Sequence, residues 1–204
     1  MKRTEIMKTC SDQAALDQWY PLDTEAEIPY GSSANRLLGT DLVVRRERDG
    51  TIQVLAEGRA EPLPMIHKLG LLWVTLGTPK GGLFALPEAE EDDRRVVNCG
   101  TVAVNASGLR IVENFLDMAH FPFVHTDILG SEPHTEVPGY LSEIRRDVDE
   151  VWATNCTFFQ SRIAATESAG DFVQLTYRVP SPFVVMLYRV CPSAPDRLDA
   201  IALF

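Results

Sequence analysis

The stretch "GLRIVENFLDMAHFPFVH", from Gly108 to His125, reads as a helix and separates two strand-rich parts of the chain. Three strand-like runs follow it, at residues 140–148, 151–160 and 172–179. Two further strands are expected at 183–191 and in the terminal "DAIALF". A helix followed by an antiparallel meander predicts an α+β fold, with the helix packed on a curved sheet.

The part before this helix also reads as strands. Residues 41–56 form two strand-like runs joined by Asp49-Gly50, which predicts a β-hairpin. "LGLLWVTLG" at 69–77 reads as a buried strand, and "VVNCGTVAVNAS" at 96–107 is strand-like. Between them, residues 78–95 are rich in Gly, Pro and acidic residues, as in a linker. We therefore expect two domains, residues 1–80 and 81–204.

Composition narrows the function classes. The formal net charge is −10 over 204 residues, which disfavours nucleic acid and anionic membranes as partners because binding to phosphates needs clustered Lys and Arg. No long apolar run or signal segment is visible, so a cytoplasmic protein without a membrane partner is expected. The four cysteines, Cys10, Cys99, Cys156 and Cys191, have no framework spacing and are expected to be reduced, the last two as core residues.

Three side chains in the helical stretch could bind a metal. Asp117 and His120 are three residues apart and would be neighbours on one helix face. His120 and His125 would lie about 140° apart on an ideal helix. A kink at Pro122 could bring the two imidazoles together on one ion. The alternative is that both are ordinary hydrogen-bonded histidines.

The segment resembles the mononuclear iron motif of the Rieske-type aromatic-ring oxygenases, Asn-x-x-Asp-x-x-His-x-x-x-x-His, at Asn114, Asp117, His120 and His125. The resemblance implies that the two histidines bind Fe(II), with O₂ and an aromatic substrate at the open positions. It also implies that Asp117 orients a ligand histidine and connects it to a Rieske cluster of a neighbouring subunit. Asn114 would lie close by.

The resemblance extends over nearly the whole chain, especially to the vanillate-demethylase-like branch. "QWYPL" at 18–22, residues 35–55 and the strand at 69–77 are similar to strands of the family's Rieske domain. Residues from 125 onward are similar to the start of its catalytic domain. The implied architecture is a remnant of the Rieske domain in residues 1–80, followed by an incomplete helix-grip, START-like antiparallel sheet with a helix in residues 81–204.

The chain departs from the family at its metal ligands. A Rieske cluster needs a Cys-x-His and a Cys-x-x-His pair, and no cysteine here is followed by histidine at either spacing. No 2Fe-2S cluster is therefore expected in this chain, and His67 is expected to be a surface loop residue. The third iron ligand, an Asp or Glu far downstream in the family, is expected to be missing. Asp127, Glu132 and Asp196 do not match its context.

A long C-terminal helix that closes the family's sheet is also expected to be missing, which would leave an apolar face open to association.

One interpretation is enzymatic: an oxygenase component that oxidises an aromatic compound by ring hydroxylation or O- or N-demethylation. Its electrons would come from a Rieske cluster on another subunit and from a reductase, in a homo- or hetero-trimer. The alternatives are a non-catalytic binding or assembly partner of intact oxygenase subunits, and a gene fragment without function. Two imidazoles without a carboxylate bind Fe(II) weakly, so the chain is not expected to be active on its own. Aromatic residues near the motif, Phe115, Phe121 and Phe123, and Met118 are candidates for a pocket or for core.

Overall fold

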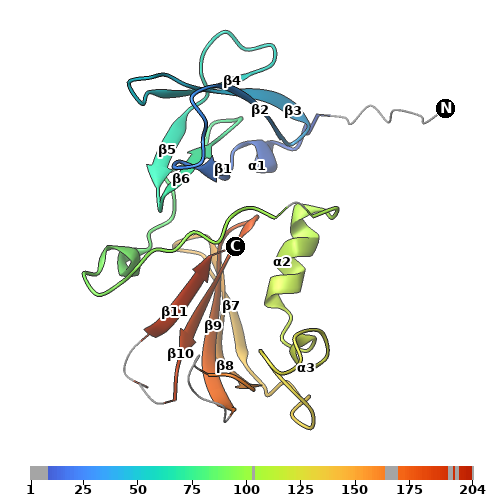
Figure 1. The fold of residues 1–204 in the computed structure, drawn as a ribbon. Helices are drawn as coiled ribbons and strands as arrows, with labels where there is room; N and C mark the ends of the chain where they lie inside the picture. The colour runs from blue at the N-terminus through green and yellow to red at the C-terminus, as the bar shows by residue number, and fades with distance from the viewer. Residues whose placement is uncertain (1–8, 103, 164–169, 193–194, 196–197, 204) are drawn as a thin grey trace, which may run out of the picture. The chain divides into compact units, whose positions relative to one another are not determined.

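A computed structural model describes residues 9–102, 104–163, 170–192, 195 and 198–203. By their contacts, the residues form two units that divide after Val104 (Figure 1). The composition of the linker suggested a boundary near residue 80. The structure instead joins residues 78–104 to the first unit, because Leu86 is buried there and the Asn98 amide donates to the Thr24 hydroxyl over 2.6 Å.

The first unit contains two three-stranded antiparallel sheets. One sheet has the order β1-β6-β5 and the other β2-β3-β4. A short helix α1, capped by the Asp12 side chain, precedes them, and a 3-10 turn η1 follows. The bounds of these elements are α1 Gln13–Leu16, β1 Tyr20–Thr24, β2 Gly31–Leu37, β3 Thr40–Arg46, β4 Ile52–Ala56, β5 Met65–Lys68, β6 Leu71–Val74 and η1 Pro87–Glu90.

Apolar residues from both sheets meet in the core of the first unit. Leu42, Val44 and Val54 come from one sheet, and Leu72 and Val74 from the other. The predicted hairpin at 41–56 is confirmed by the pairing of β3 with β4. The predicted strand at 69–77 is shorter than expected, because Leu69 and Gly70 have positive φ and form the turn between β5 and β6.

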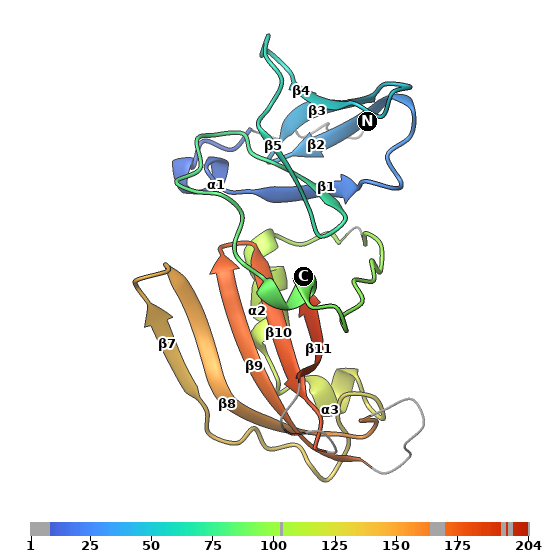
Figure 2. The ribbon, with the colours of Figure 1, turned by 90° about the vertical axis from the view of Figure 1, so that its left-hand side faces the viewer.

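The second unit is an antiparallel meander with two helices on one face (Figure 2). The strand order is β11-β10-β9-β8-β7. The bounds are α2 Gly108–Leu116, α3 Phe121–Val124, β7 Leu141–Arg145, β8 Glu150–Gln160, β9 Asp171–Ser181, β10 Val184–Val190 and β11 Leu198–Leu203. The α+β fold and the predicted meander are therefore confirmed.

The face of this sheet that carries the helices is the core of the second unit. Phe158, Val173, Leu175 and Tyr177 of the central strands pack with residues of α2 and α3. A bulge in β8, with Asn155 at φ 58°, lets Ala153 and Cys156 both face this core. Cys156 and Cys191 are buried, as predicted, and the structure shows no disulfide between cysteines in the part of the chain that it describes.

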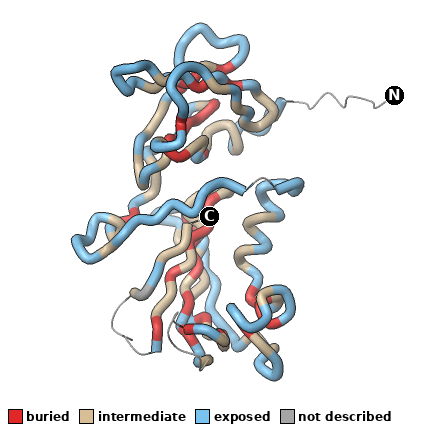
Figure 3. The backbone as a smooth tube through the Cα atoms, viewed as in Figure 1, coloured by how far each residue is buried: buried red, intermediate tan, exposed pale blue. Residues whose placement is uncertain are grey.

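Part of the apolar face at the β7 end is exposed. Ile144 of β7 pairs with Val151 of β8, and their exposed fractions are 61% and 44%. Association with another protein through this exposed apolar surface stays a prediction. The expected strand at 96–107 is absent among its described residues, which lie in no strand and are exposed, with Val102 at 80% (Figure 3).

The opposite face of the same sheet holds a buried ion pair. Arg178 donates to both carboxylate oxygens of Glu150, over 2.8 and 2.5 Å, and also to the Tyr188 hydroxyl over 3.2 Å. The Trp152 indole donates to Glu150 over 2.9 Å. These bonds tie strands β8, β9 and β10 together. In the described part of the chain, no helix is long and apolar enough to cross a membrane.

Candidate metal centre

The backbone around the motif is two helices with a break at Asp117, so the prediction of one helix over 108–125 is wrong. Helix α2 ends at Leu116, and Asp117 has an extended ψ of 114°. A continuous helix would press the Pro122 ring against the Met118 carbonyl, four residues earlier. Pro122 instead lies in the first turn of α3, where no amide hydrogen is needed.

The carboxylate of Asp117 organises this break. Its Oδ1 accepts a hydrogen bond from the Ala119 backbone N–H over 2.8 Å, which forms a local turn. Its Oδ2 lies 3.2 Å from Nδ1 of His120. Asp117 and His120 are therefore neighbours, as the spacing predicted, through a turn rather than along a helix face.

The two histidines converge at the ends of α3. His120 immediately precedes this helix and His125 follows it, and their ring centroids lie 5.1 Å apart. Two imidazoles that bind one ion at about 2.1 Å place their ring centres about 4.6–5.3 Å apart when the angle at the ion is about 90–110°. The observed separation fits a shared ion.

The contact with Asp117 also selects a nitrogen of His120. When Nδ1–H donates to a carboxylate, the lone pair is on Nε2, which is the usual arrangement of a metal-binding histidine. Phe121 packs edge-on against the His120 ring at 5.1 Å and lies 6.3 Å from the His125 ring. The His120 side chain is 16% exposed, so the pair is shielded on one side.

The core holds α3 in place beneath the histidines. Phe121 and Met118 are buried, and the Phe121 ring meets the Phe158 ring of β8 at 5.5 Å, edge to face. Phe123 is instead 63% exposed. Phe115 is partly buried against the same cluster. Of the apolar candidates, Met118, Phe115 and Phe121 are thus core and Phe123 is surface.

The remaining motif residue is Asn114. It lies in α2, three residues before Asp117, and it is exposed. The structure therefore places it near the break. Among the described residues, no hydrogen bond fixes its amide.

A third metal ligand is not found in the part of the chain that the structure describes. No group of three or more His, Cys, Asp or Glu side chains there could hold a metal ion. Asp127 is exposed, with φ 64°, and Glu132 is exposed before Pro133. Asp196 lies outside the described residues. The residues present fit two ligands of a metal and an orienting carboxylate.

His67 is not in a loop, and that prediction is wrong. It lies in β5, where its Nδ1 is 3.2 Å from Oε1 of Glu25, with the imidazole 48% exposed. Sequence reasoning missed β5 because its four residues stand directly between a proline and the Leu69-Gly70 turn. His67 is therefore explained by a surface contact with the Glu25 carboxylate.

Two solved structures share this fold. A Pseudomonas putida CBB5 NdmA mutant with caffeine matches with a TM-score of 0.65 and 17% identity over 87% of this chain and 65% of that chain. Dicamba monooxygenase bound to 3,6-dichlorosalicylic acid matches with a TM-score of 0.65 and 12% identity over 92% of this chain and 72% of that chain. At these identities the likeness shows a shared fold alone.

Sequence comparison then gives the family. The vanillate O-demethylase oxygenase C-terminal domain matches residues 104–190. The probable methylxanthine N7-demethylase NdmC of Pseudomonas sp. (strain TJI-51) is 46% identical over 191 residues, which cover 93% of this chain and 67% of that protein. The chain belongs to the Rieske-type oxygenases, in the vanillate-demethylase-like branch. It spans about two thirds of the length of the relatives it matches.

Proposed function

We propose that the chain is a component of a Rieske-type oxygenase in which His120 and His125 hold Fe(II). The observation that carries the proposal is the convergence of the two rings at 5.1 Å, with the Asp117 carboxylate on Nδ1 of His120. Helix α3 spaces the histidines and the core beneath it holds them. Together with the family, this geometry favours an iron site over two unrelated histidines.

Each residue of the site has a defined task. Asp117 accepts the Nδ1–H of His120 and so keeps Nε2 free for the ion. Phe121 covers one side of both rings and excludes water there. Asn114, one turn earlier on α2, adds a polar group beside Asp117. The bound iron would supply the centre at which O₂ is reduced and the substrate oxidised.

In this proposal the iron site also needs a third ligand and a source of electrons. Two imidazoles retain Fe(II) weakly, because ferrous iron ranks low in affinity and needs a hard carboxylate. A complete site would need a third, carboxylate ligand, and none is found among the described residues. The sequence has no cluster motif, so electrons would come from a reductase through a Rieske cluster on another subunit, with Asp117 at the point of entry. Residues 1–104 would be a Rieske-type domain without cluster ligands, and 105–203 the first part of the catalytic domain.

The reaction we propose is oxidative N-demethylation of a heteroaromatic compound. The name of the 46% identical relative favours it over ring hydroxylation or O-demethylation. One oxygen atom of O₂ is inserted into a methyl C–H bond, and two electrons and two protons reduce the other to water. The resulting hydroxymethyl group leaves as formaldehyde, and the ring nitrogen keeps a hydrogen.

Anaerobic equilibrium dialysis against Fe(II) tests the site. At saturating Fe(II) we expect binding that approaches one ion per wild-type chain, with weak affinity. The affinity of His120→Ala/His125→Ala should be at least about tenfold lower. Asp117→Asn keeps the shape but weakens the acceptor for Nδ1–H, so its affinity should fall by about 10–100-fold.

The matched control is His67→Ala/His134→Ala, which removes the two other histidines and should bind Fe(II) as the wild type does. Equal binding by all variants would contradict the proposal. No saturable binding by a folded wild-type chain would favour the assembly-partner alternative.

A further inference from the structure

Tyr177 presents a buried hydroxyl without a partner. It lies in β9 on the core face of the sheet and is 2% exposed. Its Oη makes no hydrogen bond to any residue that the structure describes. Burying an unpaired hydroxyl costs free energy, and nearly all buried polar groups avoid this cost by finding a partner. An acceptor that binds there would remove this cost.

The other buried tyrosine of the sheet shows the usual arrangement. Tyr188 of β10 lies on the opposite face, where its hydroxyl accepts a hydrogen bond from Arg178 over 3.2 Å. The two residues have the same side chain and similar burial in neighbouring strands. Only the hydroxyl on the face that carries α2 and α3 is left unpaired.

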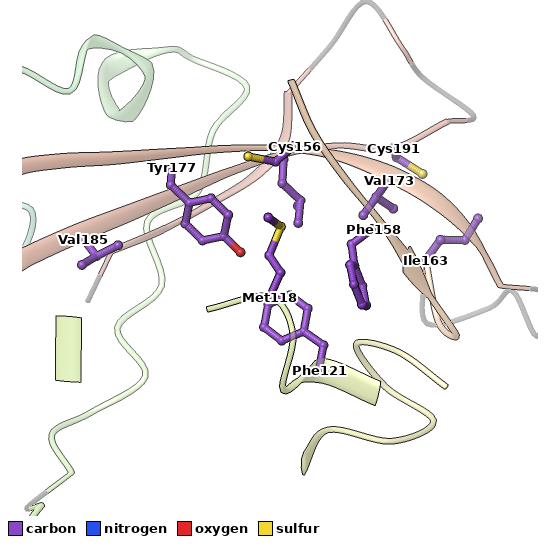
Figure 4. Packing of buried hydrophobic residues seen from close by; sticks show 10 residues of the cluster. Met118, Phe121, Cys156, Phe158, Ile163, Val173, Tyr177, Val185 and Cys191 are labelled. Atoms are coloured by element: carbon purple, nitrogen blue, oxygen red, sulfur yellow. The ribbon is translucent and has the colours of Figure 1, made fainter. Parts of the chain in front are cut away.

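The surroundings of this hydroxyl connect it to the candidate metal centre. In Figure 4 the Tyr177 hydroxyl points toward Met118, which directly follows Asp117. Burial raises the pKa of Tyr177 above its usual range, and the charges of Cys156 and Asp117 raise it further. The group is therefore a protonated donor at neutral pH. Met118 is unbranched and flexible, so its side chain can move aside for a ligand.

We propose that Tyr177 determines specificity by donating a hydrogen bond to a carbonyl oxygen of a planar heteroaromatic substrate. The inference rests on the proposed function, since it places the substrate on the face of the sheet that carries His120 and His125. A phenol donor discriminates between ligands with and without a carbonyl, because only the former satisfy the buried group.

Binding of caffeine to the purified full chain, measured by titration calorimetry, tests this role. Caffeine is a planar heteroaromatic with two ring carbonyls, and indole serves as a planar ligand without one. In Tyr177→Phe the affinity for caffeine should fall by between about threefold and tenfold, and the affinity for indole should not change. The thermal unfolding midpoint should stay equal or rise, because the variant loses an unpaired buried group.

Tyr188→Phe is the matched control. It should lower the unfolding midpoint, since it removes a bonded hydroxyl, and leave the affinity for caffeine unchanged. Equal caffeine affinity in wild type and Tyr177→Phe would overturn the role of Tyr177 while leaving the iron site intact. A lower midpoint for Tyr177→Phe with unchanged affinity would make the hydroxyl structural. A wild-type chain that binds Fe(II) but not caffeine would overturn both this role and the proposed substrate class.

Discussion

The buried cores of the two units support different parts of the chain. In the first unit the buried residues belong to strands, and the connections around Glu57–Pro64 are mostly exposed and hold no cysteine or histidine. In the second unit Met118 and Phe121 are buried within the segment that carries Asp117, His120 and His125. A sheet can therefore persist without ligand-bearing loops, whereas the candidate ligands of the second unit depend directly on its core.

The largest expected effect that tests this contrast is loss of the Trp73 side chain. Trp73 is 1% exposed, meets the Phe84 ring at 5.7 Å, and donates from its indole to the Lys68 carbonyl over 3.0 Å. Trp73→Ala should lower the unfolding free energy of the first unit by about 3–5 kcal/mol. Denaturant titration followed by circular dichroism measures it.

If the units are independent in the way described, Trp73→Ala should leave Fe(II) binding unchanged below its unfolding midpoint. The control is Tyr30→Ala, a change at a 66% exposed aromatic of the same unit, which should be nearly neutral. Parallel loss of Fe(II) binding in Trp73→Ala would break the comparison.

Phe158→Ala should cost a similar or smaller free energy but should also disturb the metal site. Phe158 is 1% exposed and supports the Phe121 ring at 5.5 Å, and Phe121 precedes Pro122 in α3. We expect a loss of about 3 kcal/mol in stability. We also expect a drop of about tenfold in Fe(II) affinity, because the imidazole rings of His120 and His125 lose their support.

Phe172→Ala, at a 48% exposed position of the same sheet, is the control. A destabilised Phe158→Ala with normal Fe(II) affinity would show that α3 holds its shape without the core.

Most of the fold could be predicted from the sequence where apolar and polar residues alternate. Strand β9 shows this period plainly, and its Val173, Leu175 and Tyr177 are all buried. The valines at 96–104 satisfy the same propensity but find no strand partner in the described structure, since propensity alone does not supply one. Short β5 lacks enough residues to show any period.

The candidate site could be predicted only in part. Spacing placed Asp117 beside His120, and the structure shows that contact. Spacing alone put His120 and His125 on different sides of one helix, and the structure brings their rings to 5.1 Å across the short helix α3 instead of through a kink at Pro122. Spacing did not show that the helix ends at Asp117, because that break depends on a side-chain-to-backbone bond to Ala119. It also could not reveal the unpaired hydroxyl of Tyr177, which depends on packing between strands and helices distant in sequence.

The smallest expected effect concerns the hairpin turn of the first unit. The Thr51 backbone N–H donates to Oδ1 of Asp49 over 2.9 Å, and this bond holds the pKa of the Asp49 carboxyl below its usual range. A depressed pKa means that the folded state favours the ionised carboxylate. Its contribution to stability is therefore present above the unfolded pKa of about 3.9 and is lost as the pH falls through the folded pKa.

Asp49→Asn keeps an acceptor oxygen but removes the charge. Its unfolding midpoint should be slightly lower than that of the wild type at pH 7, and the difference should disappear as the pH falls through the folded pKa of Asp49. Glu61→Gln, an exposed acid of the same unit whose removal touches no turn, is the control. A difference that persisted in acid would mean that the Asn amide disturbs the turn itself, and the first unit would then depend on a loop side chain as the second does.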